Sequence, residues 1–315
     1  MMNLTDIEGA AARITNHVRR TPLWRVPNAT LRGTVPYDLY LKLELLQVTG
    51  SFKPRGAFNR VLSESVTPRG LVTSSGGNHG IAVAYVGQTL GVPVSIPLPA
   101  TVAPEKLAAM RSLGAEAEVV GPTFFVSNAR AKEIAAERGY LYLHPFAEPE
   151  GVAGQGTIGL EILQDLPEVD VVVVAVGGGG LLGGVAAAIK QRNPKVTVIG
   201  VEPVGADALT RSLAAGQLVT LDKISTKAAT LAPPMTAQIN FDLARRYVNT
   251  LVHVTDEEME SAAQWLWRHC FIGAELGGAA STAALLSGRV AIAPGQKVVS
   301  IVCGGGTAGM NAALS

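Results

Sequence analysis

The stretch Val169-Asp170-Val171-Val172-Val173-Val174-Ala175-Val176-Gly177-Gly178-Gly179-Gly180-Leu181-Leu182-Gly183-Gly184 joins an apolar run to four consecutive glycines. The apolar run is rich in β-branched residues and does not alternate, which predicts a strand buried on both faces of a parallel sheet. An alanine-rich helix is expected from Val185 to Gln191. Consecutive glycines let a bound group approach the amide N–H donors at a helix N-terminus, where an anion is favoured. The stretch therefore predicts a phosphate-binding turn; a tight turn without a ligand is the weaker interpretation.

Length and composition limit the classes of protein to consider. The chain has 315 residues, of which 48% are hydrophobic, which is enough for one large or two ordinary domains. Only 16% are charged and the formal net charge is +1, so neither nucleic acid nor an anionic membrane is an expected partner. Two cysteines, Cys270 and Cys303, give no disulfide framework and no zinc spacing. These features predict a cytoplasmic protein.

The rest of the chain repeats a strand-turn-helix pattern from Gly70 onward, which predicts α/β architecture with parallel sheets. A helix is expected from Gly156 to Leu166, and a capping box of Thr5 and Glu8 is expected to start the first helix. Small-residue loops also occur at 74–80 and 303–307. All three glycine-containing loops follow strands, and ligands bind at that edge of open α/β sheets.

The loop 74–80 suits an anion the size of a carboxylate, because small residues and an amide precede a helix. Lys53 lies at a junction, since Pro54 disfavours the helical region for the residue before it and fits the first turn of a helix. A phosphate site, a carboxylate site and this lysine together indicate a phosphorylated cofactor acting on an amino or carboxylic acid. Taken singly, Lys53 is more often a surface group and Asn78 a turn residue.

A second interpretation uses the same glycines differently. Gly178-x-Gly180-x-x-Gly183 satisfies the dinucleotide fingerprint, and Glu202 lies near where a ribose-binding acid is expected. This pattern is typical of a nicotinamide-dependent oxidoreductase. It leaves the loop 74–80 without a function.

Three segments, 51–57, 75–80 and 177–180, together resemble the motifs of fold-type-II pyridoxal-phosphate enzymes, with serine/threonine dehydratases and serine racemases as the nearest branch. The similarity runs from about Thr21 to Thr307. The resemblance implies two parallel-sheet α/β domains of the tryptophan synthase β-subunit-like architecture, with pyridoxal phosphate in the cleft between them. Residues 1–54 and 148–315 would form the large cofactor-binding domain, and residues 55–147 a small inserted domain.

The resemblance also implies a role for each motif residue. Lys53 would be the catalytic residue and would hold the cofactor as a Schiff base, with Phe52 beside the cofactor ring. Asn78 would bind the phenolic oxygen, while Glu275 and Cys303 would lie near the ring, Cys303 facing its nitrogen. The remaining predicted contacts fall into two sets: for the cofactor phosphate, Gly177, Gly178, Gly179, Gly180 and Leu181; for the substrate carboxylate, Ser75, Gly76, Gly77 and His79.

The implied reaction is β-elimination of a β-hydroxy amino acid, most simply L-threonine or L-serine, to a 2-oxo acid and ammonia. An amino acid racemase of the same fold is the alternative. Gly76 stands where the racemases carry a serine acid/base, and a buried thiol at Cys303 stays neutral, so elimination is favoured over racemisation.

Two further expectations follow from the same resemblance. Glu202 and the Ala206 carbonyl match a divalent-cation site of some members, but Ala208 stands where a second acid is needed. We therefore expect no metal, and Glu202 has an alternative role at a strand end. The chain is expected to form a homodimer and to bind a small amino acid substrate.

Overall fold

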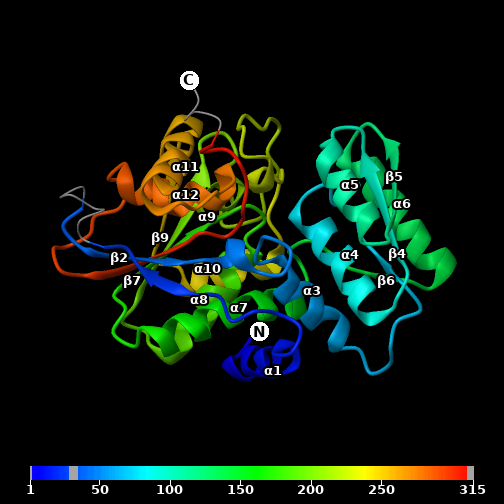
Figure 1. The fold of residues 1–315 in the computed structure, drawn as a ribbon, viewed down its shortest axis with the longest axis horizontal. Coiled ribbons are helices and arrows are strands. Elements are labelled where there is room, and N and C mark those ends of the chain that lie inside the picture. The colour runs from blue at the N-terminus through cyan, green and yellow to red at the C-terminus, as the bar shows by residue number, and fades with distance from the viewer. Residues whose placement is uncertain (1, 28–34, 311–315) are drawn as a thin grey trace.

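The computed structural model describes residues 2–27 and 35–310, and these form two units, each built around its own sheet (Figure 1). The large unit contains a six-stranded sheet and the small unit a four-stranded sheet. Both sheets are parallel except for one antiparallel edge strand in the larger. The predicted α/β class is confirmed.

The large sheet has its most buried strand where the apolar run predicts it. Its strands in spatial order are β1 (Leu23–Arg25), β2 (Asp38–Lys42), β10 (Lys297–Ile301), β7 (Val171–Ala175), β8 (Thr197–Pro203) and β9 (Thr250–Val254). All five residues of β7 are buried, with parallel strands paired on both sides. The uniform valine run thus reflects burial on both faces.

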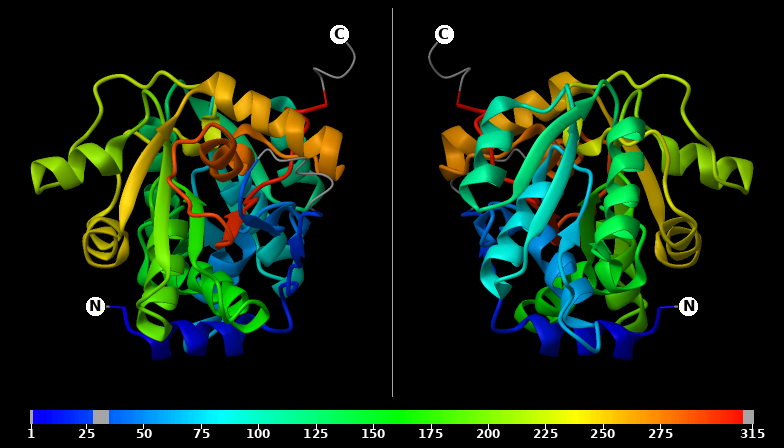
Figure 2. Two further views of the ribbon diagram at one scale, coloured as in Figure 1. Left: turned by 90° about the vertical axis from the view of Figure 1, so that its left-hand side faces the viewer. Right: turned by 90° about the vertical axis from the view of Figure 1, so that its right-hand side faces the viewer.

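Helices cover both sides of the large sheet, as Figure 1 shows. Below it are α1 (Leu4–Ile14), α7 (Pro149–Asp165), α8 (Gly180–Arg192) and α10 (Gln238–Tyr247); above it are α11 (Asp256–Cys270) and α12 (Leu276–Leu286). The side views show α1 at the base of the molecule (Figure 2). Among the described residues no helix combines the length and apolarity needed to cross a membrane.

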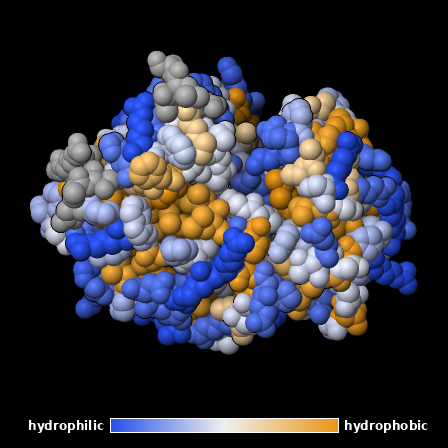
Figure 3. Space-filling model, in the orientation of Figure 1, coloured by the Kyte–Doolittle hydropathy of each residue, from blue (hydrophilic) through white to orange (hydrophobic). Residues whose placement is uncertain are grey.

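All four strands of the small unit come from the segment Leu71–Tyr142. Its sheet has the order β5 (Glu116–Gly121), β4 (Val94–Pro99), β3 (Leu71–Val72) and β6 (Leu141–Tyr142), and it carries α4 (Asn78–Leu90), α5 (Pro104–Ser112) and α6 (Phe124–Arg138). Figure 3 shows the molecular outline notched between the two units.

The helix α3 (Lys53–Leu62) packs against both units. Phe58 and Val61 belong to the apolar core of the small unit. On the large-unit side the backbones of α3 and α7 meet so closely that a Cβ on Gly154 would lie 2.4 Å from the Arg55 carbonyl oxygen. The predicted domain boundary at 54/55 falls inside this helix, and the two domain ranges remain a prediction.

Three predicted helix starts are wrong. The capping box of α1 is made by Asn3 and Asp6, not by Thr5 and Glu8. The helix expected from Gly156 begins at Pro149, because proline is well suited to a first helical turn. The helix expected from Val185 begins at Gly180, since the packing of α8 outweighs the low helix propensity of glycine.

Candidate active site

The four glycines form a turn at the C-terminal end of β7 that leads directly into α8. Gly179 has φ +90°, a left-handed conformation that side chains disfavour, and a Cβ on Gly178 would lie 2.3 Å from the ring of Phe146. The first hydrogen bond of the helix runs from the Gly183 N–H to the Gly179 oxygen at 2.8 Å. The N–H groups of Gly180, Leu181 and Leu182 therefore precede the helical hydrogen-bond pattern and are available to an anion.

Side chains from outside the motif fix this turn. The Gly178 carbonyl oxygen accepts hydrogen bonds from Thr236 Oγ1 at 3.0 Å and from Asn240 Nδ2 at 2.7 Å. Because a trans peptide points its C=O and N–H in opposite directions, the Gly179 N–H is turned away from these two residues. The sequence reasoning missed Thr236 and Asn240, which lie about 60 residues after the glycines and share no motif with them.

Lys53 is the first residue of α3, and Phe52 is its N-cap. Lys53 therefore lies at the predicted junction, but it is itself helical and Pro54 occupies the second helical position, not the first. The Lys53 Nζ donates to the Pro145 carbonyl oxygen at 2.8 Å and lies 5.0 Å from the centroid of the Phe52 ring. Burial lowers the pKa of Lys53 to about 8, against the opposing influence of Cys303 and Glu275. An amine of this kind loses its proton far more readily than an exposed lysine.

Lys53 and the glycine turn meet at one small cavity. Its volume is about 20 Å³, room for about one water molecule. Among the residues that line it are Phe52, Lys53, Phe146, Gly180 and Leu181. The structure therefore brings the predicted catalytic lysine to the predicted phosphate turn, although 127 positions separate Lys53 from Gly180 in the sequence.

The segment 73–77 connects β3 to α4 and offers a second helix N-terminus; the predicted loop 74–80 extends too far, because Asn78, His79 and Gly80 are already helical. Gly77 is the N-cap of α4 and no side chain caps the helix, so the first-turn N–H groups of α4, which have no partner within the helix, are not bound by a capping side chain. Gly80 is required by close approach, because its Cβ would lie 2.1 Å from the Ser75 carbonyl oxygen. The Ser75 hydroxyl accepts a long bond of 3.4 Å from the Gly77 N–H.

His79 lies in the first turn of α4. The ring is buried with Nε2 3.3 Å from the Leu143 carbonyl oxygen. Burial, followed by the nearby charge of Lys53, lowers the pKa of His79 to about 3, so the ring is neutral at physiological pH. Gly76 offers no side-chain proton donor, and a Cβ there would lie 3.2 Å from Val102 Cγ2.

Asn78 and Glu275 join the two units. Asn78 Nδ2 donates to Glu275 Oε1 at 2.8 Å, and Glu275 is the N-cap residue of α12. Burial raises the pKa of Glu275, and Lys106 is the strongest opposing influence. Lys106 Nζ also donates to Asn78 Oδ1 at 2.9 Å. Lys106 was not anticipated from the sequence, because a lysine on a helix is usually a solvated group.

Cys303 lies just beyond β10 and is buried. Its Sγ donates to the Gly277 carbonyl oxygen at 3.4 Å. Burial raises the pKa of the thiol well above its ordinary value, so the side chain is neutral at pH 7. A neutral group at this position agrees with the expectation from a buried thiol.

Glu202 caps a helix. Its carboxylate accepts hydrogen bonds from the N–H groups of Leu209 and Thr210, both at 2.9 Å, and from the Thr210 hydroxyl at 2.6 Å, at the start of α9 (Ala208–Ala215). Ala206 is also buried. Within residues 2–27 and 35–310 no group of three His, Cys, Asp or Glu side chains gathers as metal ligands do. The hydrogen bonds from Leu209 and Thr210 occupy both carboxylate oxygens of Glu202.

Comparison with known proteins agrees with the cofactor class that the site residues indicate. Residues 14–304 match the family described as pyridoxal-phosphate dependent enzyme. The L-threonine ammonia-lyase of Thermotoga maritima is 39% identical over 97% of this chain and 76% of its own length, and the phenylserine dehydratase of Ralstonia pickettii is 37% identical over 97% and 93%. The structure of maize serine racemase superposes with a TM-score of 0.92 at 30% identity, covering 97% of this chain and 94% of the other.

The chain belongs to the pyridoxal-phosphate-dependent enzymes. Within that family it is a fold-type-II enzyme of the threonine dehydratase and serine racemase branch, and its cofactor is pyridoxal phosphate. The alternative interpretation as a nicotinamide-dependent oxidoreductase is wrong. The acid that it needed for the ribose, Glu202, is fully buried and caps α9.

Proposed function

We propose that this enzyme eliminates water from a β-hydroxy amino acid, L-threonine or L-serine, and that hydrolysis of the resulting enamine takes up water again, releases ammonia and leaves a 2-oxo acid. The observation that carries the proposal is the cavity shared by the Lys53 amine and the first turn of α8. Similarity to an L-threonine ammonia-lyase supports the substrate class. Phenylserine is a further candidate, because a phenylserine dehydratase is also similar over nearly the whole chain.

The donor groups present match those that the cofactor needs. Gly177, Gly178, Gly179, Gly180 and Leu181 would hold the phosphate through backbone N–H groups, since Gly178 and Gly179 leave no room for side chains. Lys53 would bind the aldehyde carbon and Phe52 would flank the ring. Asn78 would donate to the phenolic oxygen, Glu275 would hold the Asn78 amide, and Cys303 would face the ring nitrogen as a neutral thiol.

When bound, the cofactor supplies an electron sink for the bond broken at the substrate Cα. The chain supplies positioning and proton transfer. The first-turn N–H groups of α4, framed by Ser75, Gly76, Gly77 and His79, would bind the substrate carboxylate. The Lys53 amine would accept the α-proton, because burial keeps its pKa low enough for the neutral form to be populated. The β-hydroxyl would then leave as water, and hydrolysis of the released enamine would give the 2-oxo acid and ammonia.

Absorption spectroscopy tests the site. Purified enzyme supplied with pyridoxal phosphate should show a violet-region absorbance band that borohydride removes, with the label on Lys53 after peptide mapping. Lys53→Ala should lose both the band and ammonia release, whereas Lys195→Ala, at an exposed position, should keep both. A labelled lysine other than Lys53 would overturn the assignment.

A substrate panel tests the reaction. L-Threonine, L-serine and phenylserine should be scored for ammonia and 2-oxo acid, and the recovered amino acid for its D-enantiomer. Because Gly76 provides no acid/base on the face opposite Lys53, oxo-acid formation should exceed D-enantiomer formation by more than about tenfold. The reverse ratio would establish the racemase alternative, which is consistent with the similarity of this chain to maize serine racemase.

We further propose a cytoplasmic homodimer without a metal requirement. Phe271, the C-cap residue of α11, is 82% exposed, and a second subunit would give this apolar ring a surface to pack against. Cys270 and Cys303 are both unpaired, which suits a reducing compartment. Sedimentation should give twice the mass of the 32.7 kDa chain, and chelator should leave ammonia release unchanged, since both Glu202 oxygens are bound by α9 and Ala206 offers only a carbonyl.

A further inference from the structure

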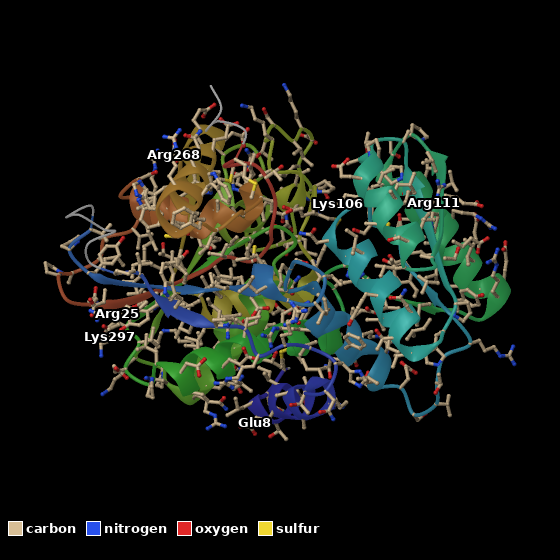
Figure 4. The ribbon with its side chains drawn as sticks, viewed as in Figure 1. Glu8, Arg25, Lys106, Arg111, Arg268 and Lys297 are labelled. Carbon is tan, nitrogen blue, oxygen red and sulfur yellow. The ribbon has the colours of Figure 1, made fainter. Side chains whose placement is uncertain are left out.

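Lys106 extends from α5 toward the large unit, in contrast to Arg111 of the same helix (Figure 4). Its side chain is half-buried, and its Nζ donates to Asn78 Oδ1 at 2.9 Å. Asn78 is the residue proposed above to contact the cofactor ring, so the inference that follows rests on the proposed site. It concerns what decides the orientation of the Asn78 amide.

An asparagine amide can be reversed, which exchanges its acceptor for its donors, and only its neighbours decide between the two orientations. Glu275 alone does not decide, because burial raises its pKa and a protonated carboxyl group could donate to the amide oxygen. An ammonium group has three donors and no acceptor. Lys106 therefore accepts only one orientation, with Oδ1 toward α5 and Nδ2 toward Glu275.

In that orientation one Nδ2 proton is committed to Glu275 Oε1 at 2.8 Å. The amide has two such protons, so the second is left for a ligand. The same ammonium group is the strongest influence that keeps Glu275 ionised, which keeps the carboxylate an acceptor. The two effects of Lys106 act in the same direction on a single amide.

We propose that Lys106 is a positioning residue, which orients the Asn78 amide so that its second Nδ2 proton faces the phenolic oxygen of pyridoxal phosphate. Lys106 acts from the small unit, and its effect on the cofactor passes through Asn78. The alternative is that Lys106 contributes charge between the two units without acting on the Asn78 amide. In that case its removal would have the same effect on cofactor binding whether or not Asn78 is present.

The test is a double-mutant cycle read out as the dissociation constant of pyridoxal phosphate from the full-length chain. Lys106→Met removes the charge and the donors but keeps the length of the side chain, and it should weaken cofactor binding about tenfold, as expected for a lost charge-assisted hydrogen bond. Lys106→Arg should restore most of the affinity. Lys195→Met, which removes an exposed lysine, should leave it unchanged.

The second arm of the cycle uses Asn78→Ala. If Lys106 acts through the amide, Lys106→Met should have less than about a twofold effect in the Asn78→Ala background. Equal effects in both backgrounds, or no effect in either, would overturn the inference while leaving the proposed site intact. If Asn78→Ala alone does not weaken cofactor binding, the proposed contact of Asn78 fails, and the inference fails with it. Should Lys106→Met not fold, Lys106→Gln tests the same cycle, because its amide can satisfy either orientation of Asn78.

Discussion

The Lys53 amine is buried, and its charged form is less stable there than in water. Burial lowers its pKa from 10.5 to about 8. Between these two pH values the unfolded chain binds more protons than the folded chain, so the free energy of unfolding rises with pH through this window. The destabilisation is fully present below pH 8. An active-site lysine thus reduces the stability of the cofactor-free protein at neutral pH.

Lys53→Met tests this relation without any catalytic assay. The cofactor-free variant should be more stable than the wild type at pH 7 by about 1–3 kcal/mol, and the difference should narrow as the pH rises from 8 toward 10.5. Urea unfolding at several pH values measures it, with Lys195→Met as the control. A difference that does not vary with pH would show that burial of the charge is not its cause.

Gly178 is the residue at which the phosphate turn tolerates least change. A Cβ there would lie 2.3 Å from the Phe146 ring, so Gly178→Ala should displace the turn, weaken pyridoxal phosphate binding at least about tenfold and cost about 1–3 kcal/mol of stability. Gly9→Ala in α1, where an added Cβ would meet only the flexible end of the Arg13 side chain at 3.3 Å, is the control and should be neutral or slightly stabilising. Cofactor titration and urea unfolding would measure both. Unchanged cofactor affinity in Gly178→Ala would contradict the proposed role of the turn.

At the scale of elements, α3 is fixed by a buried ionic cluster two residues beyond Lys53. Arg55 is fully buried and pairs with Glu44 at 2.8 Å and with Glu161 of α7 at 2.7 Å. Lys42 also pairs with Glu161. Removing the guanidinium leaves buried carboxylates without their main counter-charge, which costs far more than the loss of an exposed pair.

Arg55→Met should therefore lower the free energy of unfolding by about 3–5 kcal/mol. Arg130→Met, which breaks exposed pairs with Glu133 and Glu137, should lower it by less than about 1 kcal/mol. Equilibrium urea unfolding compares the two variants. Similar small losses in both would mean that the cluster does not anchor α3.

The elements show what the sequence can predict and where it stops. β7 and the glycine turn were predictable because their signal is local: a valine run and then four glycines. By contrast α12, whose segment Leu276–Leu286 is rich in small residues, was not predicted; nine of its residues are buried, so it has no polar face to give a helical period. The anchors Thr236 and Asn240 were missed because their contact with Gly178 arises only from tertiary packing.

At the scale of the whole molecule, the proposed site draws on both units. The glycine turn belongs to the large unit, whereas Asn78 and the carboxylate loop belong to the small unit. Among the described side chains, Asn78 and Glu275 provide a direct hydrogen bond between the two parts. The sequence motifs indicated that these segments meet, because their order and spacing resemble a known family. They did not indicate Lys106, whose contact with Asn78 depends on how α5 packs beside α4.

Binding pyridoxal phosphate should therefore stabilise both units together. At a cofactor concentration 100 times the dissociation constant, the gain in unfolding free energy is about 2.7 kcal/mol, which calorimetry should detect as a rise in the thermal midpoint. Hydrogen exchange gives the location of this stabilisation. Amides in the first turn of α8 should be protected because they would bind the phosphate, and amides in the first turn of α4 because the side chain of Asn78, its first residue, would contact the cofactor ring. Amides of α1, which lies at the base of the molecule (Figure 2), serve as the internal control and should not change. Protection confined to α8 would mean that the cofactor is held by the large unit alone, and the role assigned to Asn78 would be wrong.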